Sequence, residues 1–165
     1  MLKKLVFILL VFLTACTNSQ SKPALDLNSD DISSCVPINS VVETGYVYDI
    51  IDGDTFRVTI KGENFKVRLI GIDSPEMDEP FYYSSKMFLD QLILNREVEL
   101  YKDSSNTDQY SRLLRYVFVD DIFVNYEIVL NGYALNKTYP PDTACSISFS
   151  NAHLYAKENN LGLNN

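Results

Sequence analysis

The chain has 165 residues, with 14 basic and 22 acidic side chains and a formal net charge of −8. This length allows one modest domain plus a leader. An acidic chain repels phosphates at long range, which is untypical of a general nucleic-acid binder. A polyanionic ligand would therefore need a local basic patch and a metal ion.

Residues 1–15 have the pattern of a secretory signal. Lys3 and Lys4 precede an apolar run that is too short to anchor the chain across a bilayer. The segment ends in LTAC at Cys16, which resembles the acylation site of bacterial lipoproteins. We expect an exported domain, anchored to a bacterial membrane by lipid on Cys16; an ordinary secretory signal is the alternative. Loss of Lys3 and Lys4 with the signal changes the net charge from −8 to −10.

Residues 16–42 are rich in Ser, Asn and Asp without apolar periodicity, which is typical of a flexible tether. The folded domain is expected over residues 43–165. If Cys16 is lipidated, Cys35 and Cys145 remain as a pair, and two thiols of an exported protein usually form a disulfide. This bond would join the end of the tether to the C-terminal region; two free buried thiols are the alternative.

Five segments have the alternating or β-branched pattern of half-buried strands. They are Thr44–Ile51, Thr55–Ile60, Phe65–Ile70, Glu97–Tyr101 and Leu113–Asp120. Helical patterns follow the third and fifth of them, and another helical pattern lies near the C-terminus. This order predicts a mainly β, α+β domain, a five-stranded barrel of the OB type with three helices. A less regular α+β domain is the alternative.

The three helices are expected over residues 80–94, 125–130 and 148–160. Pro80 suits the first turn of the first helix. Asn125 is a plausible N-cap of the second helix, and Ser148 or Ser150 suits the N-cap of the third.

Two acidic motifs flank the second and third strands. DGDT ends one residue into the second strand, and DSPE follows the third. Pairing of these strands would bring Asp54 close to Asp73. Their carboxylates and the backbone carbonyl of Ser74 are hard oxygen donors, which suit Ca²⁺ or Mg²⁺ rather than zinc. Either aspartate alone could simply cap a turn, but two such motifs at one end of a strand pair favour a metal site.

Three further charged residues fit phosphate chemistry. Glu76 follows Asp73 closely enough to face the same space and to take a proton from a water molecule at the metal. Arg68 stands in a strand where Val or Thr would pack better, and its planar guanidinium group suits bidentate contact with a phosphate. Arg112 follows the polar loop 102–111 and could reach the same phosphate; a solvated loop arginine is the alternative.

In their order along the chain, DGDT, VRLIGIDSPE and the Asp108-x-Tyr110-x-Arg112 pattern resemble the staphylococcal nuclease family of secreted phosphodiesterases. The similarity spans roughly residues 45–162. It implies an OB barrel with three helices and a calcium-dependent nuclease that hydrolyses DNA and RNA, with 3′-phosphate products. We expect the protein to be a monomer.

The resemblance implies a role for each motif residue: calcium ligation by Asp54, Asp73 and the Ser74 carbonyl, proton abstraction by Glu76, and neutralisation of transition-state charge by Arg68 and Arg112. Asp52 would support the calcium ligands from behind, and Tyr110 would donate a hydrogen bond to the terminal phosphate of the substrate. Tyr139 is our own candidate for stacking on a base.

This chain departs from the family pattern in places. Ser111 stands where the family usually has glycine, and Leu163 where a tryptophan is common. The archetype is basic, whereas this chain is acidic. These differences leave open a second interpretation, an OB module that binds nucleic acid with little or no turnover. The presence of both acidic motifs together with Arg68 and Arg112 favours the active nuclease.

Overall fold

The structure of the protein, a computed structural model, describes residues 33–37 and 42–164. The expected signal at residues 1–15 and the expected lipidation at Cys16 lie outside the described residues. Among the helices of the described ranges, none has the length and apolar character needed to cross a membrane.

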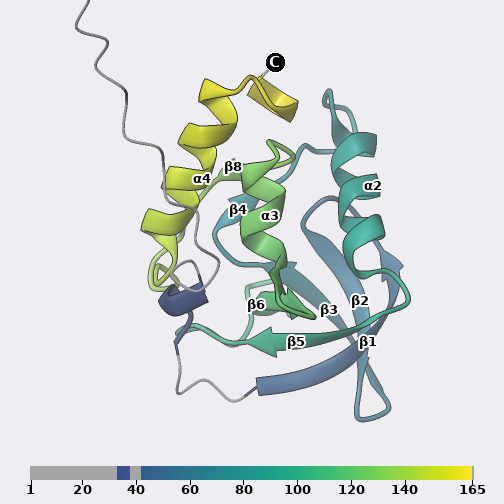
Figure 1. The fold of residues 1–165 in the computed structure, drawn as a ribbon. Coiled ribbons are helices and arrows are strands. Elements are labelled where there is room, and N and C mark those ends of the chain that lie inside the picture. The colour runs from purple at the N-terminus through teal and green to yellow at the C-terminus, as the bar shows by residue number, and fades with distance from the viewer. Residues whose placement is uncertain (1–32, 38–41, 165) are drawn as a thin grey trace, which may run out of the picture.

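Five strands form a closed barrel, as the sequence predicts (Figure 1). They are β1 (Val42–Ile50), β2 (Thr55–Ile60), β3 (Glu63–Leu69), β5 (Glu97–Tyr101) and β6 (Leu113–Val119). Neighbours in the order β3-β2-β1-β5-β6 are antiparallel. A parallel pairing of β3 with β6 closes the barrel, and its register runs from Val67↔Leu113 to Leu69↔Arg115.

Alternation of side chains explains which face of each strand is buried. In β2, the apolar side chains of Phe56, Val58 and Ile60 are buried, and Arg57 between them is exposed. In β3, Val67 and Leu69 are buried in the same way. Because a shift of one residue would turn these apolar side chains to solvent, the pattern holds the register of the strand pair.

Three short strands extend this framework. β7 (Ile122–Phe123) pairs with β6, and β4 (Ile72–Asp73) pairs with β8 (Leu135–Asn136). β8 follows the helix α3 (Val124–Leu130) and lies about 60 residues after β4 in the chain. The β4–β8 pairing therefore brings a C-terminal segment to the acidic motif at the end of β3.

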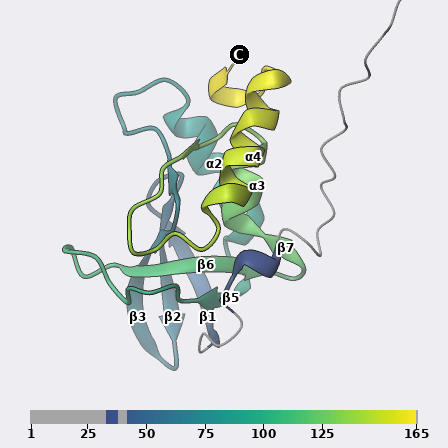
Figure 2. The same ribbon diagram turned by 90° about the vertical axis from the view of Figure 1, so that its left-hand side faces the viewer.

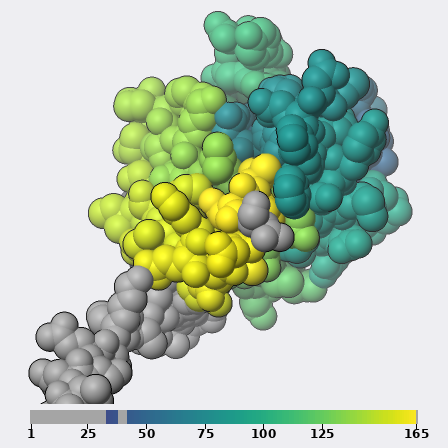
Figure 3. All heavy atoms as spheres, turned by 90° about the horizontal axis from the view of Figure 1, so that it is seen from above, coloured from purple at the N-terminus to yellow at the C-terminus, as the bar shows by residue number. Residues whose placement is uncertain are grey.

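Three α-helices lie over one end of the barrel (Figures 1 and 2). They are α2 (Tyr82–Ile93), α3 (Val124–Leu130) and α4 (Ser146–Glu158), accompanied by the 3₁₀ turns η1 (Ser33–Cys35) and η2 (Gly162–Asn164). α3 packs against both α2 and α4. Seen from above, the C-terminal end of the chain after α4 lies next to α2 (Figure 3). Leu163 of η2 and Phe81 before α2 line one open pocket there.

The predicted helix starts are wrong in detail. α3 begins at Val124, so Asn125 is inside the helix, where it is fully buried. Its amide donates to the carbonyls of Ile70, at 3.0 Å, and Arg115, at 3.2 Å, and its Oδ1 accepts from the backbone N–H of Val117 at 2.9 Å. Asn125 therefore joins α3 to the seam between β3 and β6, where its buried side chain satisfies backbone groups that have no access to water.

The other two expected helix starts also differ from the structure. α4 begins at Ser146, directly after Cys145, so Ser148 and Ser150 lie within the helix. α2 begins at Tyr82, two residues after Pro80. The residue between them, Phe81, has a φ of 68° and ends the preceding loop.

Cys35 and Cys145 form the predicted disulfide, with their Cα atoms 5.0 Å apart. The bond joins η1 to the start of α4, and Val36 next to it is buried in the core. Residues 33–37, expected to belong to the tether, thus pack against the domain. β1 begins at Val42, one residue before the expected start of the domain.

Candidate active site

The DGDT and DSPE motifs meet because they stand at the same end of the β2–β3 pair. Thr55 pairs with Arg68, and the backbone N–H of Leu69 donates to the carbonyl of Asp54 at 2.9 Å. Gly53 permits this approach. A Cβ atom on Gly53 would lie 2.7 Å from the Cβ of Ser85 and 2.8 Å from the Cβ of Ser74, so a larger residue would push the two motifs apart.

Arg68 joins the two aspartates. Its Nε lies 3.0 Å from Asp54 Oδ1, and its Nη2 lies 3.1 Å from Asp73 Oδ1. Its Nη1 donates to two backbone carbonyls, those of Leu69 at 2.7 Å and Ile72 at 2.8 Å. Three hydrogen bonds and the ion pair with Asp54 thus fix the guanidinium group, and both carboxylates contact the same cation.

Asp54 is only 5% exposed. Its Oδ2 accepts from the backbone N–H of Ser74 at 2.8 Å, and its Oδ1 accepts from the hydroxyl of Thr55 at 2.9 Å. Burial raises the pKa of Asp54 to about 6; Arg68 opposes this shift and the charge of Asp52 adds to it. A buried carboxylate with these surroundings needs a cation beside it to remain charged.

Asp52 orders the loop behind Asp54. Its Oδ1 accepts from the backbone N–H of Asp54 at 3.0 Å, which is the hydrogen bond of an Asx turn. This position agrees with the supporting role that we expect for Asp52.

Asp73 has a second cationic partner that the sequence did not reveal. Lys137 Nζ lies 2.7 Å from Asp73 Oδ2. The lysine follows β8, and its backbone N–H donates to the carbonyl of Gly71 at 3.0 Å. The proximity of Asp73 holds the pKa of Lys137 above its usual range. No local motif marks this lysine, because β4 and β8 are far apart in the chain.

Arg112 is oriented by Asp108. Its Nε donates to Asp108 Oδ2 at 2.7 Å, and the backbone N–H groups of Arg112 and Tyr110 donate to Asp108 Oδ1 at 3.0 and 2.9 Å. Burial opposes ionisation of Asp108, but the hydrogen bonds from Arg112 and Tyr110 outweigh it and lower the pKa. The guanidinium carbon of Arg112 also lies 5.4 Å from the centre of the Tyr110 ring. Asp108 and Tyr110 therefore fix the position of the Arg112 side chain, which is not freely solvated.

The loop that carries Arg112 runs between β5 and β6 and extends beyond the barrel (Figure 2). Asp142 fastens its start, because Asp142 Oδ1 accepts from the backbone N–H groups of Ser104, at 3.0 Å, and Ser105, at 2.7 Å. Arg115 fastens its middle, with bonds from Nη1 and Nη2 to Asn106. These contacts give the loop a defined path to the site.

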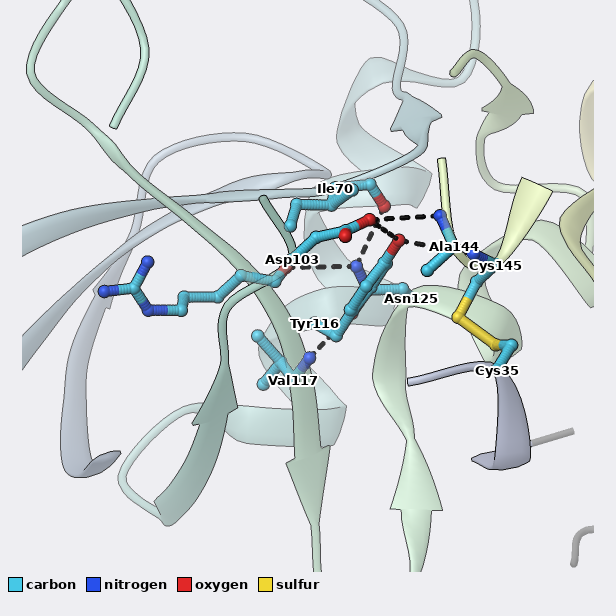
Figure 4. The surroundings of a disulfide bond; sticks show 9 residues. Cys35, Ile70, Asp103, Tyr116, Val117, Asn125, Ala144 and Cys145 are labelled. Carbon is cyan, nitrogen blue, oxygen red and sulfur yellow. Dashed lines mark hydrogen bonds between the residues drawn. A yellow bond between two sulfur atoms is a disulfide. The ribbon is translucent and has the colours of Figure 1, made fainter. Parts of the chain in front are cut away.

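A hydrogen-bond network connects this loop to the disulfide (Figure 4). Asp103 Oδ2 accepts from the hydroxyl of Tyr116 at 2.9 Å and from the backbone N–H of Ala144 at 3.0 Å. The Tyr116 oxygen in turn accepts from the backbone N–H of Cys145 at 3.3 Å. Burial and the nearby Asp103 raise the pKa of Tyr116, so its hydroxyl stays protonated as a donor.

The predicted residues share one cavity of about 400 Å³. Its walls include every predicted metal, catalytic and substrate-binding residue: Asp52, Asp54, Arg68, Asp73, Ser74, Glu76, Tyr110, Arg112 and Tyr139. Glu76 is exposed at the wall of this cavity, and its backbone N–H donates to Glu79 Oε2 at 2.8 Å. A cavity lined by several carboxylates and two guanidinium groups suits a phosphodiester near a divalent cation.

The donor chemistry fits calcium with water completing the coordination. Asp54 and Asp73 both contact the guanidinium group of Arg68, so their carboxylates lie close together, and Ser74 follows Asp73 directly in the chain. Within residues 33–37 and 42–164, no three Asp, Glu, His or Cys side chains form a group that could hold a metal ion. The protein would thus supply two carboxylates and one carbonyl, leaving open positions for water and substrate.

Ser111 has a φ of 61°, a left-handed conformation that favours glycine. Ser111→Gly should therefore raise the free energy of unfolding by about 0.5–1 kcal/mol, since relief of strain exceeds the added entropy of the unfolded chain. The shift of the urea midpoint measures this gain. Ser105→Gly in the same loop is the matched control and should destabilise. A Ser111→Gly variant no more stable than the parent would contradict the expected strain.

Comparison with known proteins places these residues in context. A model of the family described as "Staphylococcal nuclease homologue" matches residues 66–165. The chain belongs to the staphylococcal nuclease family. It is 32% identical over 127 residues to the thermonuclease of Staphylococcus intermedius, covering 73% of this chain and 76% of that protein. The expected family is therefore confirmed. At the level of the family, the chain is a nuclease and thus a hydrolase.

Two further relatives also carry the names of nucleases. The thermonuclease of Staphylococcus hyicus is 31% identical over 110 residues, covering 63% of this chain and 65% of the relative. An uncharacterized endonuclease of Haemophilus influenzae is 37% identical over 89 residues, which cover 53% of this chain and 49% of that protein. Nuclease names thus recur among the relatives of this staphylococcal nuclease family member.

Proposed function

We propose that this chain is a calcium-dependent phosphodiesterase that hydrolyses DNA and RNA to products with 3′-phosphates. The observation that carries the proposal is the convergence of Asp54 and Asp73 on Arg68, in a cavity that Glu76 and Arg112 also line. The names of its thermonuclease relatives support a nuclease.

Each side chain has a task in this reaction. Calcium held by Asp54, Asp73 and the Ser74 carbonyl would supply positive charge beside the phosphate oxygens. Glu76 takes the proton of the attacking water, whose oxygen then bonds to phosphorus. For a 3′-phosphate product the bond from phosphorus to the 5′-oxygen breaks, that oxygen takes a proton from solvent water, and Glu76 gives its own proton back to the solvent.

The two arginines stabilise the charge that develops on phosphorus. Arg68 is held by the backbone carbonyls of Leu69 and Ile72, and Arg112 is held by Asp108, so neither group must be reorganised when the charge appears. Tyr110 and Tyr139 expose most of their surface at the cavity, where they can contact the terminal phosphate and a base.

We further propose export and lipid anchoring at Cys16. The disulfide between Cys35 and Cys145 supports an oxidising location, since such bonds persist outside the cytoplasm. Metabolic labelling with radioactive palmitate tests the anchor. The parent should carry label, and a Cys16→Ala variant should not.

A second candidate is a nucleic-acid-binding module with little or no turnover. Ser111, which stands next to Arg112 where the family usually has glycine, favours it over an active nuclease. Hydrolysis of DNA and RNA by the purified chain, with calcium or with a calcium chelator, separates the two. Calcium-dependent cleavage leaving 3′-phosphate ends supports the nuclease. Binding without cleavage under both conditions supports the module.

Glu76→Gln should lower kcat on the order of 10² or more, because the amide cannot accept the proton of water. Stability should change little, since Glu76 is exposed. Steady-state kinetics at saturating calcium and a urea titration measure the two effects. Glu97→Gln, an exposed site on β5 outside the cavity, is the control. Parental turnover in Glu76→Gln would show that another group is the base.

A further inference from the structure

Lys137 forms an ion pair with Asp73, and it contacts a carboxylate oxygen that a bound calcium ion would also contact. Its Nζ lies 2.7 Å from Asp73 Oδ2, and Arg68 already takes Oδ1 of the same carboxylate. Both oxygens of Asp73 are therefore bound to cations of the protein itself. Neither acidic motif includes Lys137, which reaches the site only because β8 pairs with β4.

The two cations on Asp73 differ in how easily they can move. Arg68 is 13% exposed and also bonded to Asp54 and two backbone carbonyls. Lys137 is 50% exposed, and its ammonium also lies 5.8 Å from the centre of the Tyr139 ring. Lys137 can thus leave Asp73 at little cost, whereas Arg68 cannot.

A calcium ion on Asp73 would lie close to this ammonium group. Calcium–oxygen distances are about 2.3–2.6 Å, and Lys137 Nζ is 2.7 Å from Oδ2. An ion on that oxygen would thus stand within roughly 5 Å of Nζ. Repulsion between a double and a single positive charge at this distance weakens binding several-fold even in water with physiological salt.

We propose that Lys137 competes with calcium for Asp73 and so raises the calcium concentration that the site requires. The inference rests on the calcium ligation in the proposed function. Its consequence is a site suited to the calcium-rich medium outside a cell, where protein modules bind calcium with Kd values of about 10⁻⁴–10⁻³ M. Inside the cytoplasm, such a site would stay empty and the nuclease inactive.

The opposite role for Lys137 predicts the opposite result. A lysine that merely orients Asp73 as a ligand would help the ion to bind, and loss of an orienting partner typically weakens metal affinity about 10–100-fold. The direction of the change in Kd therefore separates competition from orientation.

Isothermal titration of calcium into the full chain, kept in detergent because of its apolar leader, tests the proposal without any assay of activity. Lys137→Met should lower the Kd for calcium roughly three- to tenfold. Lys137→Arg, which keeps the charge, should remain near the parental Kd. An unchanged or higher Kd in Lys137→Met overturns the proposal.

Lys61→Met is the matched control. Lys61 is an exposed lysine in the turn between β2 and β3, at the far end of the strand pair from Arg68. At about 3.3 Å per residue, it lies roughly 20 Å from the site. Its replacement removes the same charge and should leave the Kd for calcium unchanged. A fall in Kd equal to that of Lys137→Met would overturn the proposal, because it would reflect net charge alone.

Asp73→Asn distinguishes failure of this inference from failure of the proposed function. Suppose that the parent binds calcium, that Asp73→Asn does not bind it, and that Lys137→Met binds it no more tightly than the parent. The calcium site is then supported, and the role of Lys137 is overturned. If the parent binds no calcium up to 10⁻² M, about ten times the upper range for extracellular modules, and Lys137→Met binds none either, both are overturned.

Discussion

Arg68→Ala should lower kcat/KM on the order of 10²–10³ and also lower the free energy of unfolding by about 3 kcal/mol. The first effect follows from the loss of a preorganised positive charge beside the phosphate. The second follows because Asp54, only 5% exposed, would lose its ion pair. The carbonyls of Leu69 and Ile72 would lose a donor as well.

Kinetics at saturating calcium and urea unfolding measure the two effects separately. Arg68→Lys keeps the charge without the planar fork, so it should recover much of the stability and little of the activity. Arg57→Ala is the matched control on β2. Its exposed ion pair with Asp49, at 3.2 Å, should contribute less than about 1 kcal/mol and nothing to turnover. An unchanged urea midpoint in Arg68→Ala would show that Asp54 does not depend on this arginine.

Removal of the disulfide by the double substitution Cys35→Ser and Cys145→Ser should cost about 4 kcal/mol of unfolding free energy. The two cysteines are 110 residues apart, so the bond restricts nearly the whole domain in the unfolded state. Both cysteines are replaced together because one remaining thiol could pair with another molecule.

Urea unfolding of the parent with and without reductant provides the comparison. The reduced parent should match the double variant, and reductant should leave the variant itself unchanged. Below its unfolding transition the variant should keep turnover within a few-fold of the parent, because Asp103, Tyr116 and the backbone of Cys145 can still form their network. A loss below about 1 kcal/mol would contradict the loop-closure argument.

Local patterns were sufficient to predict the five barrel strands to within two residues at each end, but not the short strands β4 and β8. The alternation in Thr55–Ile60 matches β2 at both ends, and the predicted Glu97–Tyr101 matches β5. The alternation can be seen in each strand alone, because successive side chains point to opposite faces and only one face meets the core. Asn125 shows where local patterns fail. A polar residue before an apolar run favours an N-cap, but its partners are the backbones of Ile70, Arg115 and Val117, which only the folded barrel brings there.

The candidate site divides in the same way. The convergence of Asp54 and Asp73 was predictable because both flank one antiparallel pair, whose ends must meet. Asp108 was visible within a motif but without a role, since its use is to hold Arg112. Lys137 gave no signal at all.

By itself, the sequence determined the family, the five-stranded barrel and the two acidic motifs, because alternation, turn residues and short motifs act within a few residues of one another. The disulfide pair followed from the number of cysteines once Cys16 was expected to carry lipid. Only the tertiary structure decided that Arg68 ties both aspartates together, that Asn125 bridges the barrel seam, and that Lys137 faces Asp73. Each of these contacts depends on the direction of a long side chain and on pairing between distant segments. Direction and pairing arise from packing of the whole domain, which no short stretch of sequence encodes.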